Sequence, residues 1–166
     1  MKVFTLSLII VASSFTFTSA CSQNVLTNIL TQNSGIVKKG KTVFVEVTIN
    51  NTDPTNYVGI YKIRAQISVP AAIATIASTG HVLPTGWTII SNDGSTINLS
   101  NGKDMIAATD ARTILIAVQG VKTGGPSTIS CQLSFADGNS PGTTPGTLKG
   151  DNPADNSSTT TIKVNR

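Results

Sequence analysis

The stretch TVFVEVTIN, from Thr42 to Asn50, decides the fold class of this chain. Val or Ile stands at every second position, and this period of two matches the alternating faces of a β-strand rather than the 3.6-residue turn of a helix. Four side chains are therefore expected to share one face and enter a core: Val43, Val45, Val47 and Ile49. The opposite face would carry Phe44, Glu46 and Thr48, and we expect Glu46 to be solvated there.

The same alternation recurs along the chain. The stretch from Lys62 to Val69 would direct four side chains inward: Ile63, Ala65, Ile67 and Val69. Thr113 to Val121 is apolar on both faces, which predicts a central strand. Ser127 to Ala136 is expected to form another strand after a Gly-Gly-Pro turn, and Ser158 to Val164 would be the closing strand.

Turn residues separate these runs about every ten residues, as in all-β sandwiches. Trp87 to Ser91 and Thr96 to Leu99 flank the segment NDGS, in which Asp-Gly favours a tight hairpin. Asn51 to Asn56 is predicted to be a turn because Asx side chains cap their own backbone. Ala71 to Ser78 could be a strand or a short helical turn. Asp137 to Asp155, rich in Gly, Pro, Thr and Asn, predicts a long exposed loop.

These elements predict an all-β, immunoglobulin-like β-sandwich of about seven or eight antiparallel strands with Greek-key connections. Periodicity by itself does not separate a sandwich from a closed barrel, but the spacing of the turns favours the sandwich. A chain of 166 residues has room for one domain. We expect the domain to span residues 42–166, after an N-terminal segment, residues 21–41, that carries the first strand.

Residues 1–20 have the features of a secretory signal peptide: Lys2 near the start, an apolar run, and small residues before Cys21. The sequence TSAC also approaches a lipobox, in which Cys21 would be lipidated, although Thr18 stands where Leu is usual. Two interpretations stay open, a secreted protein and a lipoprotein anchored to the outer membrane. Either one predicts an exported protein at the cell surface or in the medium.

The only other cysteine is Cys131, which is expected to pack as a small apolar residue if Cys21 is lipidated. If Cys21 is free, a bridge between Cys21 and Cys131 becomes an alternative in an oxidising compartment. Two cysteines and the single His81 do not provide the paired ligands of a zinc site.

The composition argues against nucleic-acid binding and against catalysis. The formal charge of +4 comes from basic residues spread along the chain, with Lys38, Lys39 and Lys41 as the tight cluster. His81 lacks the sequence context of a catalytic triad, and a turn or surface position is the expected role. Glu46 is the single glutamate, and Lys122 lies outside any phosphate-binding loop motif. We therefore expect no enzyme and no catalytic residues.

Two groups of residues are candidates for binding. Tyr57 and Tyr61 flank a turn and are expected to be exposed, whereas Trp87 is expected to fill the core. Calcium prefers oxygen ligands on loops, so one segment supplies weak calcium candidates: Asp151, Asn152, Asp155 and Asn156, joined by Asp137 and Asn139 only if the loop folds back. Turn capping is the favoured role of these Asx residues, and no cofactor is otherwise expected.

Three segments carry a family resemblance: LPTGW at residues 83–87, IAATDART at 106–113 and GDNPADNSS at 150–158. They resemble the Ig-like repeats of bacterial surface proteins known as domain of unknown function eleven, which are close in architecture to CARDB cell-adhesion modules. The resemblance covers roughly residues 42–164. It implies an Ig-like fold without catalytic residues. Such repeats usually stand in tandem, whereas this sequence holds a single copy directly after an export signal.

Together these features predict a non-catalytic cell-surface module for adhesion, with a protein or glycan as partner. The membrane would be contacted only through a lipid on Cys21, and nucleic acid is not an expected partner. A lipoprotein that scaffolds a periplasmic or outer-membrane complex is the alternative. A secreted hydrolase is a weaker one, because the sequence shows neither a general base nor paired carboxylates.

Overall fold

The computed structural model describes residues 24–136, 145–146, 148 and 150–166. Strands dominate the described chain, and no helix in it is long and apolar enough to cross a membrane. The strands are β1 (Val25–Thr31), β2 (Ile36–Lys38), β3 (Thr42–Asn51), β4 (Ile63–Ser68), β5 (Ala74–Ile76), β6 (Thr88–Asn92), β7 (Thr96–Ser100), β8 (Ala111–Gly120), β9 (Gly124–Ala136), β10 (Pro145–Gly146) and β11 (Ser157–Asn165). Two 3-10 turns, η1 (Asn33–Gly35) and η2 (Pro153–Asp155), join them.

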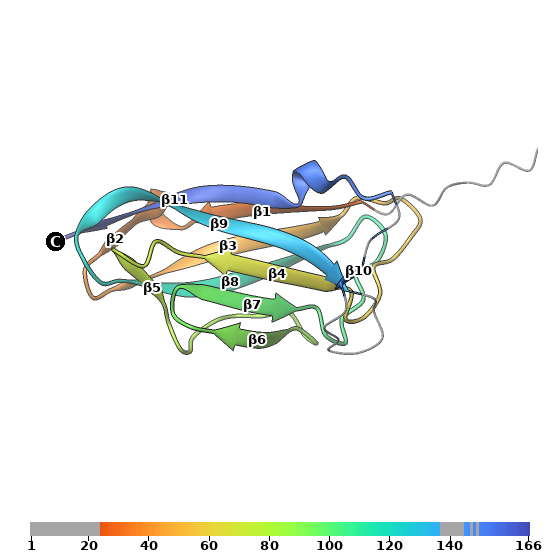
Figure 1. The fold of residues 1–166 in the computed structure, drawn as a ribbon, viewed down its shortest axis with the longest axis horizontal. Coiled ribbons are helices and arrows are strands. Elements are labelled where there is room, and N and C mark those ends of the chain that lie inside the picture. The colour runs from red at the N-terminus through yellow and green to blue at the C-terminus, as the bar shows by residue number, and fades with distance from the viewer. Residues whose placement is uncertain (1–23, 137–144, 147, 149) are drawn as a thin grey trace, which may run out of the picture.

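The strands form two sheets that pack face to face (Figure 1). One sheet has the order β1-β3-β8-β5, and the other has the order β2-β11-β9-β4-β7-β6, with β10 paired to β9. The chain changes sheets at every connection from β1 to β6, and again between β7 and β8 and between β8 and β9, so most neighbours in a sheet are distant in sequence. This arrangement confirms the predicted β-sandwich.

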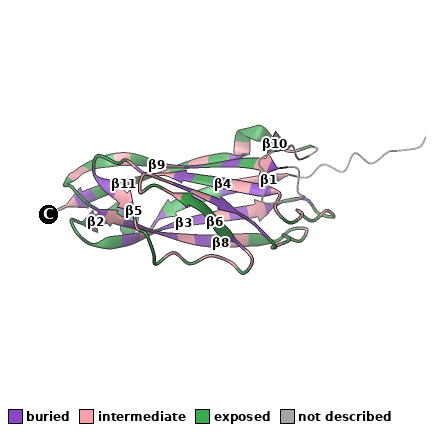
Figure 2. Cartoon of the chain, turned by 60° about the horizontal axis from the view of Figure 1, so that its bottom comes forward, coloured by how far each residue is buried: buried purple, intermediate pink, exposed green. Residues whose placement is uncertain are grey.

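The core lies between the two sheets and is built from the predicted alternation. Val45, Val47 and Ile49 of β3 are fully buried, and Val43 is 3% exposed. From the facing sheet, β4 contributes Ile63, Ala65 and Ile67. Buried and exposed residues alternate along the strands in Figure 2. All eight inward positions predicted on these two strands are buried.

Several local predictions are confirmed. β6 and β7 form the antiparallel hairpin, and the Asp93 carboxylate accepts hydrogen bonds from the Ser95 and Thr96 backbone N–H groups in its turn. β8 is central, between β3 and β5. Trp87 is 6% exposed and belongs to the core, as expected.

Other local predictions need correction. More strands form than the seven or eight expected, because short strands such as β2 and β5 carry too few residues for a visible period. β2 also pairs parallel to β11, so the sheet is not wholly antiparallel. The Gly-Gly-Pro segment is not a turn: it begins β9, where Gly124 pairs with Val164 of β11.

The predicted loop from Asp137 to Asp155 is also more structured than expected. Residues 137–144 lie outside the described residues, which leaves Asp137 and Asn139 untested as calcium ligands. β10 pairs with the end of β9, and Leu148 is 6% exposed within the core. In the ambiguous stretch from Ala71 to Ser78, a turn leads into the strand β5.

Connections gather at the two ends of the sandwich. We call the "loop end" the surface formed by residues 52–62 between β3 and β4, residues 101–110 between β7 and β8, and Asn24 at the start of β1. The C-terminus lies at the opposite end, as Figure 1 shows. There residues 38–42 and 120–124 connect the strands.

A core substitution tests this packing. Ile116 of β8 is fully buried, whereas Thr113 on the same strand is exposed. We expect Ile116→Ala to lower the free energy of unfolding by about 2–5 kcal/mol, because it removes buried methyl groups and leaves a cavity. Thr113→Ala should change it by less than about 0.5 kcal/mol. Urea unfolding of both variants measures the difference, and similar losses would contradict the assignment of faces on β8.

Candidate functional site

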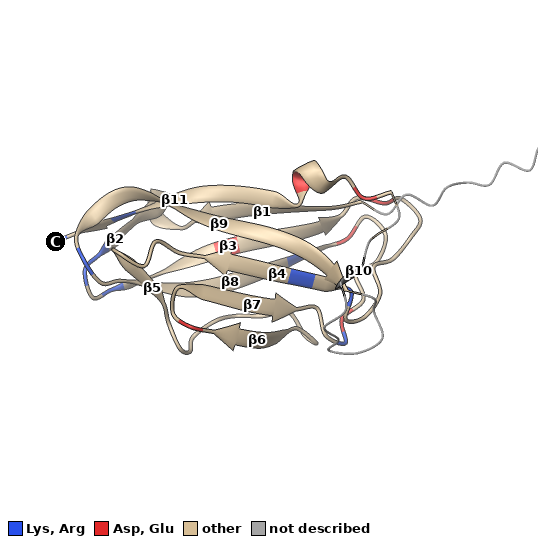
Figure 3. Ribbon diagram, in the orientation of Figure 1, with Lys and Arg blue, Asp and Glu red and all other residues tan. Residues whose placement is uncertain are grey.

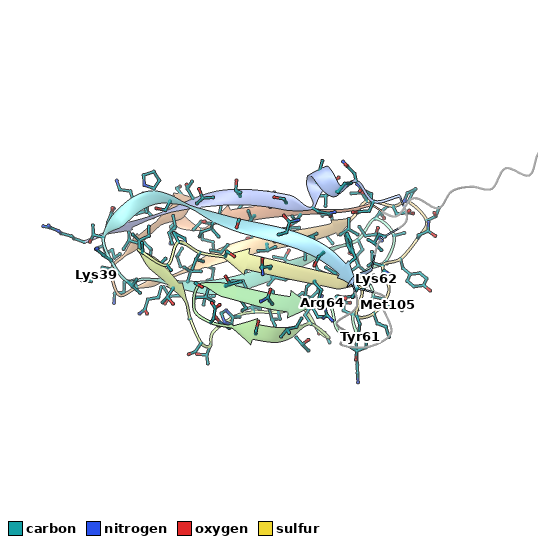
Figure 4. The ribbon with its side chains drawn as sticks, viewed as in Figure 1. Lys39, Tyr61, Lys62, Arg64 and Met105 are labelled. Carbon is teal, nitrogen blue, oxygen red and sulfur yellow. The ribbon has the colours of Figure 1, made fainter. Side chains whose placement is uncertain are left out.

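The loop end exposes a cluster of apolar side chains. Tyr57 is 61% exposed, Met105 54% and Ile60 40%. Tyr61 is half-buried and has a left-handed backbone conformation, with φ of 54°. Figure 4 shows Tyr61, Lys62, Arg64 and Met105 near one another at this end. The prediction that both tyrosines are exposed is therefore right for Tyr57 and only partly right for Tyr61.

A short bridge joins the two loops beneath this cluster. The backbone N–H of Val58 donates to the Ile106 carbonyl at 2.8 Å, and the N–H of Ile106 donates back to the Val58 carbonyl at 3.1 Å. Both side chains are fully buried. Each exposed residue, Tyr57 and Met105, is thus the direct neighbour of a residue anchored in the core.

Two buried asparagines fasten the loops further. Asn51 is 1% exposed, and its Nδ2 donates to the carbonyls of Asn56, Ile106 and Ala107. Asn101 is fully buried, its Oδ1 accepts from the Ile63 N–H at 2.9 Å, and its Nδ2 donates to the Gly59 and Asp104 carbonyls. A buried amide is stable only when such bonds are made, so these contacts fix the loop backbone.

Asp53 closes the turn that begins the first loop, as predicted for Asn51 to Asn56. Its Oδ1 accepts hydrogen bonds from the backbone N–H groups of Thr55, at 2.8 Å, and Asn56, at 2.7 Å. These two backbone donors hold the pKa of the Asp53 carboxyl below its ordinary value. The turn just before Tyr57 is therefore a charged, capped structure at neutral pH.

The carboxylate of Asp104 links the second loop to the sandwich. Trp87 Nε1 donates to Asp104 Oδ2 at 2.8 Å, and Arg112 Nε donates to the same oxygen at 2.8 Å. Arg112 also pairs with Asp110. The Asp104 carboxylate, followed by that of Asp110, raises the pKa of the Arg112 guanidinium, which in turn lowers the pKa of Asp110. The charges of Asp104, Asp110 and Arg112 satisfy one another beside the exposed apolar residues of the loop end.

The Asx residues near the end of the chain form hydrogen bonds with the start of the first strand. Asp151 Oδ1 accepts from the Val25 N–H at 3.2 Å, and Asp151 Oδ2 accepts from Asn156 Nδ2 at 2.6 Å. Asp155 Oδ2 accepts from Asn24 Nδ2 at 3.0 Å. The bonds from Val25 and Asn24 span 126 and 131 residues and tie the start of β1 to the segment before β11.

Calcium ligation at this cluster stays a prediction. Hydrogen bonds already occupy both carboxylate oxygens of Asp151 and one of Asp155, and Asn152 Oδ1 accepts from the Ala154 N–H as a cap. Buried Asp155 Oδ1 and Asn156 Oδ1 have no hydrogen-bond partner among the described residues. No group of three or more His, Cys, Asp or Glu able to hold a metal occurs within the described part of the chain.

The residues considered for catalysis lie apart. His81 is half-buried, and its Nδ1 accepts from the Ala117 N–H at 3.2 Å, while its Nε2 is buried without a hydrogen-bond partner among residues that the structure describes. His81 therefore satisfies a backbone N–H of β8 just beyond the stretch paired with β5, and it forms no hydrogen bond with a described hydroxyl. Glu46 is half-buried on β3, with Leu30 and Leu115 as register partners, rather than fully solvated.

Cys131 is a free thiol, fully buried on β9, where the Thr27 hydroxyl donates to its sulfur at 3.6 Å. Burial raises the pKa of the Cys131 thiol to about 11. The thiol is thus an uncharged, small apolar group at neutral pH, as predicted. Cys21, its alternative partner, lies outside the described residues.

Several solved structures are similar to this chain. A cohesin module from a Clostridium perfringens family 33 glycoside hydrolase shares 13% identity over 87% of this chain and 98% of its own length, with a TM-score of 0.54. A CARDB domain from Pyrococcus furiosus shares 12% identity over 86% of this chain and 89% of its own, with a TM-score of 0.48. An Ig-like protein from Nocardia farcinica shares 14% identity over 84% and 98%, with a TM-score of 0.46.

No family model and no curated protein sequence matches the chain. The Ig-like sandwich that the family resemblance implies is confirmed by the two sheets and the cohesin module. Membership in the domain of unknown function eleven family stays a prediction. The class defined by the fold is an Ig-like β-sandwich module.

Sequence reasoning identified Tyr57 but missed the residues that hold it in place. The sequence predicts Asn51 as the start of a turn, because Asn is frequent in turns, and its local pattern gives no role to Asn101. Their partners lie as far as 56 residues away, at Ala107 for Asn51 and 42 residues away at Gly59 for Asn101. Only the fold brings these partners within hydrogen-bond distance.

Replacing Asn101 tests its role. We expect Asn101→Ala to lower the free energy of unfolding by roughly 3 kcal/mol, because it leaves a buried N–H and two carbonyls without partners. The matched control is Asn98→Ala on the preceding strand β7, whose side chain makes exposed hydrogen bonds only, and it should cost less than about 1 kcal/mol. Denaturant unfolding gives both values, and amide exchange at Ile63 should accelerate only in Asn101→Ala.

Proposed function

We propose that this chain is an exported, non-catalytic binding module whose loop end contacts a protein or glycan at the cell surface. One observation carries the proposal: Tyr57, Ile60 and Met105 expose apolar side chains on loops that buried asparagines hold fixed. Exposed aromatic residues and methionine are enriched at binding interfaces.

The fixed backbone supports binding for an energetic reason. Ordering a mobile loop on association costs conformational entropy, and this cost reduces affinity. Here the Val58–Ile106 bridge and the bonds of Asn51 and Asn101 have already ordered both loops. A partner therefore meets a surface that needs little rearrangement.

The charged residues near the cluster form a polar rim. Lys62 is half-buried and Lys103 is exposed, one on each of the two loops. A central apolar patch with a charged rim is the usual anatomy of a reversible interface. The rim favours a partner that has acceptor groups around an apolar or sugar-ring contact.

The start of β1 favours envelope scaffolding as a second function. The hydrogen bond between Asn24 and Asp155 holds Asn24 at the loop end, and Cys21 precedes Asn24 by three residues. Three residues reach at most about 10 Å, so a lipid on Cys21 would hold the loop end close to the bilayer. In that lipoprotein the partner would be another component at the membrane.

A double substitution at the loop end tests the proposed interface. We expect Tyr57→Ala with Met105→Ala to weaken retention of the protein on envelope extract or immobilised glycans by about tenfold, as is typical of interface anchors. The control is Ile89→Ala with Ile90→Ala, which removes exposed apolar side chains of β6. Equal retention of the wild type and the loop-end variant in both assays would refute the proposal.

The N-terminus has a separate test. We expect intact-mass analysis of the protein from its cells to show loss of residues 1–20, since a signal peptide is removed during export. A diacyl adduct on Cys21 would select the anchored form, and Cys21→Ala should then release the protein from membranes while Ser22→Ala should not. A chain that retains residues 1–20 would contradict export by this route.

A further inference from the structure

The end of the sandwich opposite the loop end concentrates positive charge. Ten of the twelve Lys and Arg residues lie in the described part of the chain, all except Lys2 and Lys149. Six of these ten gather here and define what we call the basic end: Lys38, Lys39, Lys41, Lys122, Lys163 and Arg166. Figure 3 shows the blue segments at this end. The fold thus collects charges that look dispersed in the sequence.

Backbone contacts bring the three contributing segments together. The N–H of Gly40 donates to the Gly120 carbonyl at 2.7 Å, and the N–H of Lys39 donates to the Asn165 carbonyl at 2.8 Å. A Cβ at Gly120 would lie 2.8 Å from a methyl carbon of Val164, so glycine permits this close approach. The basic side chains are therefore carried on a fixed frame.

These cations have no acidic neighbours in their own segments. Residues 36–42, 119–124 and 162–166 contain neither Asp nor Glu. None of the six basic residues forms an ion pair with a residue that the structure describes, whereas Arg112 near the other end pairs with two aspartates. The positive potential of the basic end is left for an external anion.

A hollow lies within this surface. Lys39, Gly40, Gln119, Gly120, Val121 and Arg166 line an open depression of about 550 Å³. Its two cationic side chains come from different segments and can approach one anionic group together. The remaining lysines lie around it, so further anionic groups of the same molecule would also be neutralised.

The basic surface extends from the tip of the sandwich onto the outer face of one sheet. Lys39, Lys41 and Lys122 lie on the loops at the tip, whereas Lys38 and Lys163 lie on β2 and β11, where Val37 and Val164 point into the core and the lysines point outward. A planar bilayer would contact one side of such a surface, but a flexible linear chain can follow both.

The residue types in these segments further restrict the class of ligand that could bind. The three segments contain no Trp, Tyr or Phe. Aromatic side chains are what single-stranded nucleic acids stack on and what anchors proteins at a membrane interface. We infer that the basic end binds a linear, sulfate- or phosphate-bearing glycan through charge, at a site separate from the loop end.

The test uses the purified protein and a short heparin fragment as a model sulfated glycan. We expect binding that weakens linearly in log K against log salt, because bound cations release counterions from the polyanion. Lys39→Gln with Lys122→Gln removes two of the six cations, so the salt slope should fall by about one-third and the affinity at low salt by about tenfold. Lys62→Gln with Lys103→Gln, near the loop end, is the matched control and should change neither.

The remaining outcomes decide between ligands and sites. Equal losses in the two lysine variants, or binding unaffected by salt, would overturn the inference. Tighter binding to duplex DNA of equal charge, or to phosphatidylglycerol vesicles, than to heparin would overturn its glycan component. The Tyr57→Ala/Met105→Ala variant should keep its heparin affinity, so failure of the loop-end proposal and failure of this one are distinguishable.

Discussion

The structure depends on one constraint: the alternate Val and Ile side chains of β3 and β8 must meet those of β4 and β9 across a dry core. Val45, Ile67 and Ile116 are fully buried in that layer. A slip of one residue in β3 would turn its faces over and carry Glu46 inward, at the cost of burying an unpaired charge. The pattern therefore fixes the register of β3 as well as the existence of the sandwich.

Because the sheets satisfy this constraint by themselves, the connections between strands are free to take other roles. At the loop end that freedom is limited by polar bonds. The side chains of Asn51 and Asn101 form hydrogen bonds with seven backbone groups, which lets two loops pack against the core while Tyr57 and Met105 stay exposed. The same loops without these amides would be solvated and mobile, since unpaired buried carbonyls are costly. The loop backbone is rigid because of these hydrogen bonds. The side chains of Tyr57 and Met105 are accessible because the loops lie beyond the ends of the sheets.

The parts of the fold that the sequence predicts are those governed by local periodicity. The β3 strand, the β6–β7 hairpin and the burial of Trp87 follow from patterns a few residues long. β2, β5 and β10 are too short for any period, and Gly124 to Pro126 resembled a turn because its extended geometry depends on β11. The basic end was missed for a related reason: Lys39, Lys122 and Lys163 are far apart in sequence, and only the convergence of three strand ends makes them neighbours.

The two ends of the sandwich differ in how their charges are balanced, and this difference makes the two ends of the module chemically distinct. At the loop end Arg112 is neutralised by Asp104 and Asp110, and exposed apolar side chains lie beside these ion pairs. At the opposite end the lysines have no such partners among the described residues, and the surface is left strongly cationic. The hydrogen bond from Asn24 to Asp155 fixes the start of β1 at the loop end. A group attached before Asn24 would therefore lie at the loop end. The basic end lies at the opposite end of the two sheets and faces away from such a group.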